Sequence, residues 1–115
     1  MWACLSPAEW LRLYTAQHGQ CAICLSPLRN RYDPQDTTKC IANLDHLHAR
    51  ERELLAAGIE PSEALRRSLR GLLCGWDNRY VLQVLHDDPE KAQRAADYLT
   101  HPPARVILKL DVVDT

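Results

Sequence analysis

Two short cysteine-containing segments, far apart in the chain, constrain the fold more than any other feature. Cys21 and Cys24 form a C-x-x-C pair in the segment CAIC. In the later segment CGWD, Asp77 stands three residues after Cys74. Residues three apart on a helical turn share a face, so Cys74 and Asp77 can bind one ion together. Zinc takes four ligands from cysteine, histidine and carboxylate side chains, which predicts a structural zinc site joining the two segments.

The identity of the fourth ligand is open on these grounds. Asp77 is favoured, because a carboxylate oxygen binds zinc at a distance close to that of sulfur. The unpaired Cys40 is the main competitor, and Cys4, His18 and His86 are weaker candidates. A lone C-x-x-C pair is also compatible with two buried thiols or with a redox dithiol protein. The redox reading is the least favoured, because no β-α-β pattern surrounds the pair.

The length of 115 residues predicts one domain, residues 1–115, of a size at which a structural metal helps a modest core. No apolar run is long enough to predict a membrane span. The N-terminal segment MWACLSPAEW lacks a basic region followed by a long apolar core, so we expect no signal peptide. Five cysteines in such a chain favour free thiols or metal ligands over disulfides.

The net charge of −1 does not by itself indicate nucleic-acid binding, but the arginines are suggestive. Eleven of the 14 basic residues are arginine, which suits bidentate contacts to phosphate. A solvated helix face is an equally good interpretation of a local cluster. The cluster lies in the segment ALRRSLRGLLCGWDNRY and comprises Arg66, Arg67, Arg70 and Arg79.

A second group of polar residues lies in the segment LDHLH. Asp45 supplies an oxygen ligand suited to Mg²⁺, and a histidine such as His46 or His48 can take a proton from water. On a regular strand the two histidines share a face and Asp45 points away, so the backbone must turn for all three to converge. The alternative is a surface strand with two exposed histidines.

Asn78 follows Asp77 directly and is predicted to face a different surface. One residue rotates a helix by about 100°, so Asn78 points away from an ion held by Asp77. Its amide oxygen could then bind a second cation. The zinc site would hold the helix that bears Asn78 against the strand that bears Asp45 and His46.

Local patterns predict the remaining elements. The capping box Ser6-Pro7-Ala8-Glu9 begins a helix that ends near Gly19. The other expected elements are a knuckle at 20–28, a short strand within 40–48, helices at 49–58 and 60–69, a helix from Leu72 to Asp87, a helix at 89–101, and a terminal strand at 104–113.

The ordered set CAIC, LDHLH, RGLLCGWDN and HDDPEKAQRAADYLTHP resembles the phage recombination endonuclease VII family, within the HNH nucleases. The resemblance covers roughly residues 10–103. It implies an α+β fold with a ββα-metal (HNH, or His-Me finger) core, a zinc knuckle and several surrounding helices. It also implies a protein that cuts DNA phosphodiester bonds.

The resemblance implies a role for each matching residue. Asp45 and Asn78 would hold Mg²⁺ or Mn²⁺, His46 would be the general base, and His48 would lie at the phosphate. The implied zinc ligands are Cys21, Cys24 and Cys74. Asp77 replaces the family's fourth cysteine, and the segment Ala49–Leu69 is longer than the turn usual there.

We therefore expect a metal-dependent DNA endonuclease that nicks or fully cuts its substrate and acts in a bacterial cell or a phage-infected host. The chain lacks the long C-terminal region of the junction-resolving members, which favours a general or nicking enzyme. The alternative is a non-catalytic zinc module that binds nucleic acid or protein. The sequence leaves open whether the protein is a monomer or a homodimer.

Overall fold

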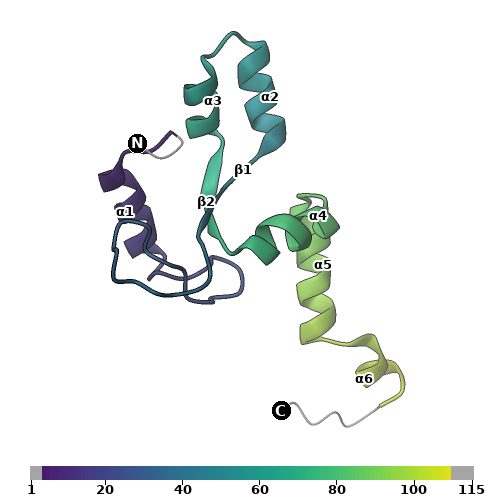
Figure 1. Ribbon diagram of the computed structural model, residues 1–115. Coiled ribbons are helices and arrows are strands. Elements are labelled where there is room, and N and C mark those ends of the chain that lie inside the picture. Colours follow the sequence, from purple (N-terminus) through teal and green to yellow (C-terminus); the bar gives the residue numbers. More distant parts are fainter. Residues whose placement is uncertain (1–3, 110–115) are drawn as a thin grey trace. The chain divides into compact units, whose positions relative to one another are not determined.

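The computed structural model describes residues 4–109 of the chain (Figure 1). They form helices and one small sheet, so the chain is of the mixed α+β class. The chain divides into two compact units, and the division falls after Leu82. None of the described helices is long and apolar enough to cross a membrane. The elements are α1 (Pro7–Ala16), β1 (Asn43–His46), α2 (His48–Ala56), α3 (Pro61–Arg67), β2 (Leu69–Leu73), η1 (Asp77–Val81), α4 (Leu82–Leu85), α5 (Pro89–Thr100) and α6 (Pro103–Ile107).

Helix α1 begins where the sequence predicts it. The Ser6 hydroxyl accepts a hydrogen bond from the Glu9 backbone N–H at 3.2 Å, and the Glu9 carboxylate accepts one from the Ser6 N–H at 3.1 Å. Both halves of the capping box are therefore present. Trp10 is fully buried, stacks on Tyr14 and meets Tyr32 edge-on. These aromatic contacts anchor α1 to the loop that leads to β1.

The two strands pair as an antiparallel sheet, and the register contains one irregularity. Asp45 pairs with Gly71, whereas the next residue, His46, pairs with Leu69. Arg70 is therefore the extra residue of a β-bulge in β2. A bulge bends its strand and re-aims a side chain, and such irregularities are common beside active sites.

The insertion between the strands forms a pair of helices, α2 and α3, which lie side by side (Figure 1). Gly58, with φ of 84°, ends α2, and Pro61 occupies the first turn of α3. Leu54 of α2 and Ala64 of α3 are buried. The two helices predicted for this segment are thus confirmed.

Gln17 ties the end of α1 to β2. Its side-chain nitrogen donates to the Leu72 carbonyl at 2.9 Å and to the Gln20 carbonyl at 3.0 Å. Its side-chain oxygen accepts from the Leu72 N–H at 2.9 Å. A Cβ atom at Gly71 would lie 3.0 Å from that oxygen, so the close approach favours glycine. The buried core lies around this junction and includes Trp10, Cys21, Leu28, Leu72, Leu73 and Cys74.

A helical segment follows β2 directly and runs from Gly75 through η1 and α4. The prediction that this helix starts at Leu72 was wrong. Leu72 and Leu73 belong to β2 instead, because they pair with β1 and are buried in the core. The five residues of η1 form a π-helix, an uncommon conformation that often marks functional sites.

The second unit contains α5 and α6. Helix α5 matches its prediction, since the Asp88 carboxylate caps the N-terminus by accepting from the Glu90 N–H at 2.9 Å. The terminal strand was wrong in its described part, because Pro103–Ile107 forms α6. Pro103 suits a first helical turn, and no described strand pairs with this segment. The predicted residues 110–113 lie outside the described range.

Candidate functional site

Four side chains from the knuckle and from the segment after β2 converge on one point. One potential ligand atom from each of Cys21, Cys24, Cys74 and Asp77 lies within 4.8 Å of the others. The sulfur atoms of Cys24 and Cys74 are 3.8 Å apart, and Cys21 Sγ lies 3.1 Å from Asp77 Oδ2. Zinc–sulfur bonds of about 2.3 Å in a tetrahedron separate two sulfurs by about 3.8 Å. This group, called here the cysteine–aspartate cluster, can therefore hold a metal ion such as zinc.

Backbone hydrogen bonds shape the knuckle that carries the first two cysteines. The Leu25 N–H donates to the Cys21 carbonyl at 3.0 Å, and the Cys21 N–H donates to the Ser26 carbonyl at 2.9 Å. The Ala22 N–H donates to the Leu72 carbonyl of β2 at 3.2 Å. The knuckle is therefore fixed to the strand that leads to Cys74, and the convergence of the cluster does not depend on flexible side chains.

The other candidates for the fourth ligand lie apart from this group. Cys40 packs against the hydrophobic core, and Cys4 is buried within it. His18 and His86 are exposed. Among the described residues, Asp77 is the side chain that completes the group.

The electrostatic environment of the cluster suits a cation. Burial raises the pKa of the Cys74 thiol to about 12, whereas a hydrogen bond with Ser26 lowers the pKa of Cys24. Hydrogen bonds with the thiols of Cys24 and Cys21 lower the pKa of Asp77. A divalent cation favours the thiolate form and offsets the cost of burying it.

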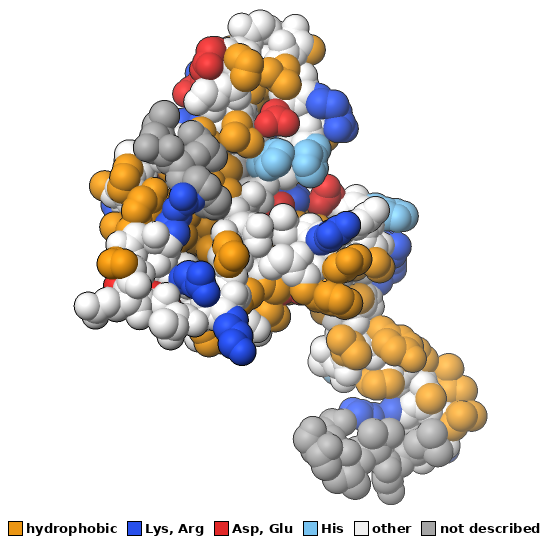
Figure 2. Space-filling view, viewed as in Figure 1, with side chains coloured by type: hydrophobic (Ala, Val, Ile, Leu, Met, Phe, Trp, Pro, Cys, Tyr) orange, Lys and Arg blue, Asp and Glu red, His pale blue; other side chains and the backbone are white. Residues whose placement is uncertain are grey.

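Asp45, His46 and His48 lie where β1 ends and α2 begins. The β-bulge follows Asp45, and His48 is already the first residue of α2. The rings of His46 and His48 are 4.4 Å apart between centroids. The backbone thus turns within this segment, as convergence requires. Histidine side chains lie together on this face, between acidic and basic ones (Figure 2).

Glu51 was not among the predicted site residues. Its Oε1 lies 3.7 Å from His46 Nε2, which is within ion-pair range but longer than a hydrogen bond. No spacing signal in the sequence indicated it, because His46 lies in the predicted strand and Glu51 in the predicted helix that follows.

Asp45 is paired with the bulged arginine of β2. Arg70 Nε donates to Asp45 Oδ2 at 2.6 Å, and Arg70 Nη2 donates to Asp45 Oδ1 at 3.1 Å. Asp45 is buried, whereas a third of the Arg70 side chain is exposed. Asp45 was predicted to bind a cation and Arg70 to contact phosphate, but in the structure the two side chains bind each other.

The other three predicted phosphate contacts differ in their surroundings. Arg66 pairs with both carboxylate oxygens of Glu9, which links α3 to α1. Arg67 pairs with Glu63 at 2.9 Å within α3. Arg79 is exposed and lies over the Tyr80 ring, 5.6 Å from its centroid. Of these three, Arg79 is the best placed to contact phosphate.

Asp77 and Asn78 have different surroundings, although they are consecutive. Asp77 is buried in the cluster, whereas Asn78 is half-buried and lines a pocket of about 500 Å³. Asn43 of β1 lines the same pocket. Residues two apart on a strand share a face, so this pocket lies along the face of β1 that carries Asp45.

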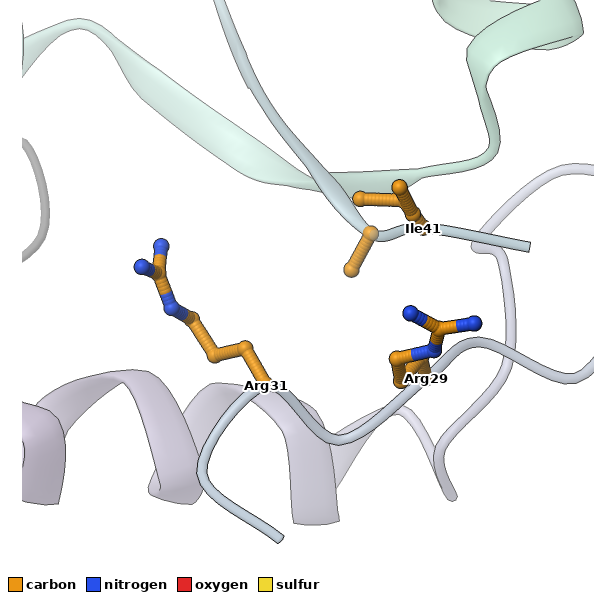
Figure 3. Close-up of a pocket in the computed structure, with 4 residues that line it drawn as sticks. Arg29, Arg31 and Ile41 are labelled. Carbon is orange, nitrogen blue, oxygen red and sulfur yellow. The ribbon is translucent and has the colours of Figure 1, made fainter. Parts of the chain in front are cut away.

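A second pocket, of about 330 Å³, lies in the loop before β1 and was not predicted. Arg29, Arg31, Ile41 and Ala42 line it, and the two guanidinium groups flank an apolar floor (Figure 3). Arg29 Nε donates to the Thr38 carbonyl at 2.5 Å. No local pattern in the sequence indicated this pocket, because the two arginines and the apolar pair belong to separate segments.

Comparison with known proteins gives two matches. The family model for recombination endonuclease VII matches residues 2–101. The Gene 59 protein of Mycobacterium phage D29 is 32% identical over 100 residues, which cover 87% of this chain and 46% of that protein. The chain thus spans about half the length of this relative. No solved structure gives a significant match.

Proposed function

Because the chain belongs to the recombination endonuclease VII family, we propose that it is a metal-dependent DNA endonuclease that hydrolyses phosphodiester bonds. The observation that carries this proposal is the placement of Asp45, His46 and His48 at a bulged strand end. The adjoining strand leads directly to the cysteine–aspartate cluster. A proton acceptor, an oxygen ligand and a rigid support are thus combined in one small unit.

The cluster fits structural zinc. Its four donors are of the types that zinc binds, and three of the four residues are buried. Zinc bound there would join the knuckle to the helical segment that begins at Gly75. The side chains of Asn78 and Arg79 would then be held by a metal-braced turn.

Asp45 and Asn78 offer the oxygen ligands that Mg²⁺ and Mn²⁺ prefer. A cation at Asp45 would have to replace the guanidinium of Arg70, and a freed Arg70 would be available to a phosphate. When bound, such a cation supplies electrostatic stabilisation of the developing charge on the phosphate.

The histidines supply the proton chemistry. His46 accepts a proton from the attacking water, and the carboxylate of Glu51 orients its ring. His48 lies against His46 and contacts the phosphate. Arg79 contacts the DNA backbone, which positions the substrate without reading its sequence.

One observation favours the alternative of a non-catalytic zinc module that binds nucleic acid or protein. The Asp45–Arg70 pair is complete without a cation, as a purely structural ion pair would be. Such a module needs the cluster but not His46 or Asn78.

A supercoiled-plasmid assay separates the two functions. We expect wild-type protein to nick or linearise the plasmid with Mg²⁺ or Mn²⁺ and not without them, and His46→Ala to be inactive. Zinc content measured on the same samples shows whether the fold is intact. A zinc-loaded wild-type protein that binds DNA and leaves the plasmid supercoiled would support the non-catalytic module. We propose action inside a bacterial cell or a phage-infected host.

A further inference from the structure

Two exposed aromatic rings stand beside the turn that completes the cluster. Trp76 is 67% exposed and Tyr80 is 44% exposed, although large aromatic side chains usually contribute to a core. Their ring centroids are 4.6 Å apart, with the planes tilted by 45°. Trp76 directly precedes Asp77, so the backbone that presents its ring is held by the cluster.

The surroundings of these rings are polar and positively charged. Trp76 and Tyr80 line the pocket of about 500 Å³ together with Asn43, Asn78, Arg79 and Gly75. The Arg79 guanidinium lies over the Tyr80 ring. The Asn43 side-chain nitrogen donates to the Ile41 carbonyl at 3.1 Å, which directs its amide oxygen to other donors. A Cβ atom built at Gly75 would contact only the Asn43 side chain, at 3.8 Å, so the pocket is open at Gly75.

From this combination we infer that the Trp76–Tyr80 pocket binds an unstacked nucleobase of single-stranded DNA. Exposed aromatic rings stack on unpaired bases, whose faces are hidden in a duplex. The amide of Asn43 matches the hydrogen-bonding edge of a base, and Arg79 matches the adjoining phosphate. A protein partner offers carbonyl and carboxylate groups to the same side chains, so the binding of single-stranded DNA, and its dependence on the two rings, decides between the two ligands.

The pocket between Arg29 and Arg31 provides an internal contrast. It offers guanidinium groups and an apolar floor but no aromatic ring in its lining (Figure 3). Such a pocket attracts a phosphate of single-stranded and duplex DNA alike. The base pocket favours single-stranded DNA, so the two sites should differ in selectivity.

This inference rests on the proposed function, since it takes DNA as the ligand. It adds a subsite to that function, namely a base-binding pocket at Trp76 and Tyr80. Because Asn78 lines the pocket, a base bound there would place its own phosphate near the predicted cation ligands.

The test measures how a short oligothymidylate and a duplex of equal length bind to the full chain in the absence of divalent cation. Binding is detected by the quenching of tryptophan emission. The chain has three tryptophans, so the emission measurements use a Trp2→Phe background. Trp10 is fully buried, so quenching in that background is expected to come from Trp76. We expect Trp76→Leu to abolish the quenching and to weaken single-strand binding by about 5- to 150-fold, with little effect on the duplex. Trp76→Phe should keep most of the affinity while it loses the quenching.

Two further variants keep the test decisive. Tyr80→Leu should also weaken single-strand binding, which covers the case in which Trp76→Leu fails to fold. Tyr98→Leu is the matched control, because Tyr98 is similarly exposed on α5, and it should bind as the wild type does. Zinc content and melting temperature identify any variant that fails to fold.

Equal single-strand affinities for wild type, Trp76→Leu and Tyr80→Leu would overturn the inference. If the wild type still cleaves plasmid, that result leaves the proposed function intact. A wild-type protein that neither binds nor cleaves any DNA would overturn both.

Discussion

The cysteine–aspartate cluster and the Asp45–Arg70 pair each contain a buried carboxylate, but they balance its charge differently. Asp77 is hydrogen-bonded to thiols and lies in a group whose ligand atoms already fit a tetrahedral ion. Both oxygens of Asp45 accept from a guanidinium instead. A buried charge needs a partner. The partners of Asp77 are thiols that can exchange their protons for a metal ion, whereas the partner of Asp45 is a guanidinium that stays charged.

This difference indicates how each region would bind a cation. At the cluster, a cation replaces only the thiol protons, so binding and folding are coupled. At Asp45, a cation must first displace Arg70, which lowers its apparent affinity. The first region suits a permanent structural ion, and the second suits a cation that enters together with a phosphate able to receive Arg70.

The largest expected effect comes from a substitution that removes one member of the cysteine–aspartate cluster. Asp77→Ala should lose the bound zinc and most of the cooperative thermal transition, because structural zinc in small domains contributes on the order of 10 kcal/mol. Asp77→Cys should keep zinc, since thiolate suits it well. Cys40→Ser is the control and should match the wild type. Zinc content and thermal melting decide, and loss of zinc from Cys40→Ser alone would show that Cys40 is the ligand.

The next effect concerns the histidine beside the pair. His46→Ala should lower the cleavage rate by about 10²- to 10⁴-fold, because a general base contributes to the transition state. Folding, zinc content and DNA binding should stay close to those of the wild type. Single-turnover plasmid nicking is the measurement. Cleavage at the wild-type rate would assign the base to another group.

Removing the guanidinium that pairs with Asp45 tests whether Asp45 can bind a cation as Asp77 is expected to do. Without divalent cation, Arg70→Gln should lower the melting temperature by about 5 °C, since it leaves a buried carboxylate unpaired. Added Mn²⁺ should then stabilise this variant more than the wild type, because its competitor is gone.

The matched control for that experiment is Arg67→Gln, which breaks an exposed pair with Glu63 and should respond to Mn²⁺ as the wild type does. If Mn²⁺ raised the melting temperatures of wild type and Arg70→Gln by the same amount, Asp45 would not be a cation ligand.

Glu51 is expected to have a smaller effect. Glu51→Gln should reduce the turnover number by up to about fivefold and leave KM unchanged, because a partly exposed ion pair contributes at most about 1 kcal/mol. Glu51→Asp should recover part of the loss. Steady-state cleavage of a labelled oligonucleotide gives both constants. A change in KM alone would point to a contact with DNA rather than with His46.

The smallest effect is electrostatic. Arg79→Gln should flatten the salt dependence of duplex binding by about one charge, since each phosphate contact releases a condensed counterion. Arg67→Gln serves for comparison and should change the slope less, because Glu63 already neutralises Arg67. A loss of affinity confined to one DNA sequence would instead indicate that Arg79 reads a base.

Sequence reasoning succeeded where the signal is local. The capping box at Ser6 and the breaks at Gly58 and Pro61 act within one or two turns, so they place α1, α2 and α3 without any distant partner. The four members of the cysteine–aspartate cluster were also accessible, because cysteine spacing and an aspartate three residues after Cys74 indicate a possible metal site without knowledge of the fold.

The tertiary structure decided what depends on segments far apart in the chain. Strand pairing, and not local propensity, assigned Leu72 and Leu73 to β2, whereas Pro103–Ile107 forms a helix and pairs with no strand within residues 4–109. The pairing of Asp45 with Arg70 depends on the bulge, since Arg70 is the extra residue of β2 and its side chain reaches the neighbouring strand. Short segments determine local hydrogen bonds and metal-ligand chemistry by themselves. Strand register and the ion pairs of buried charges form only when distant strands pair.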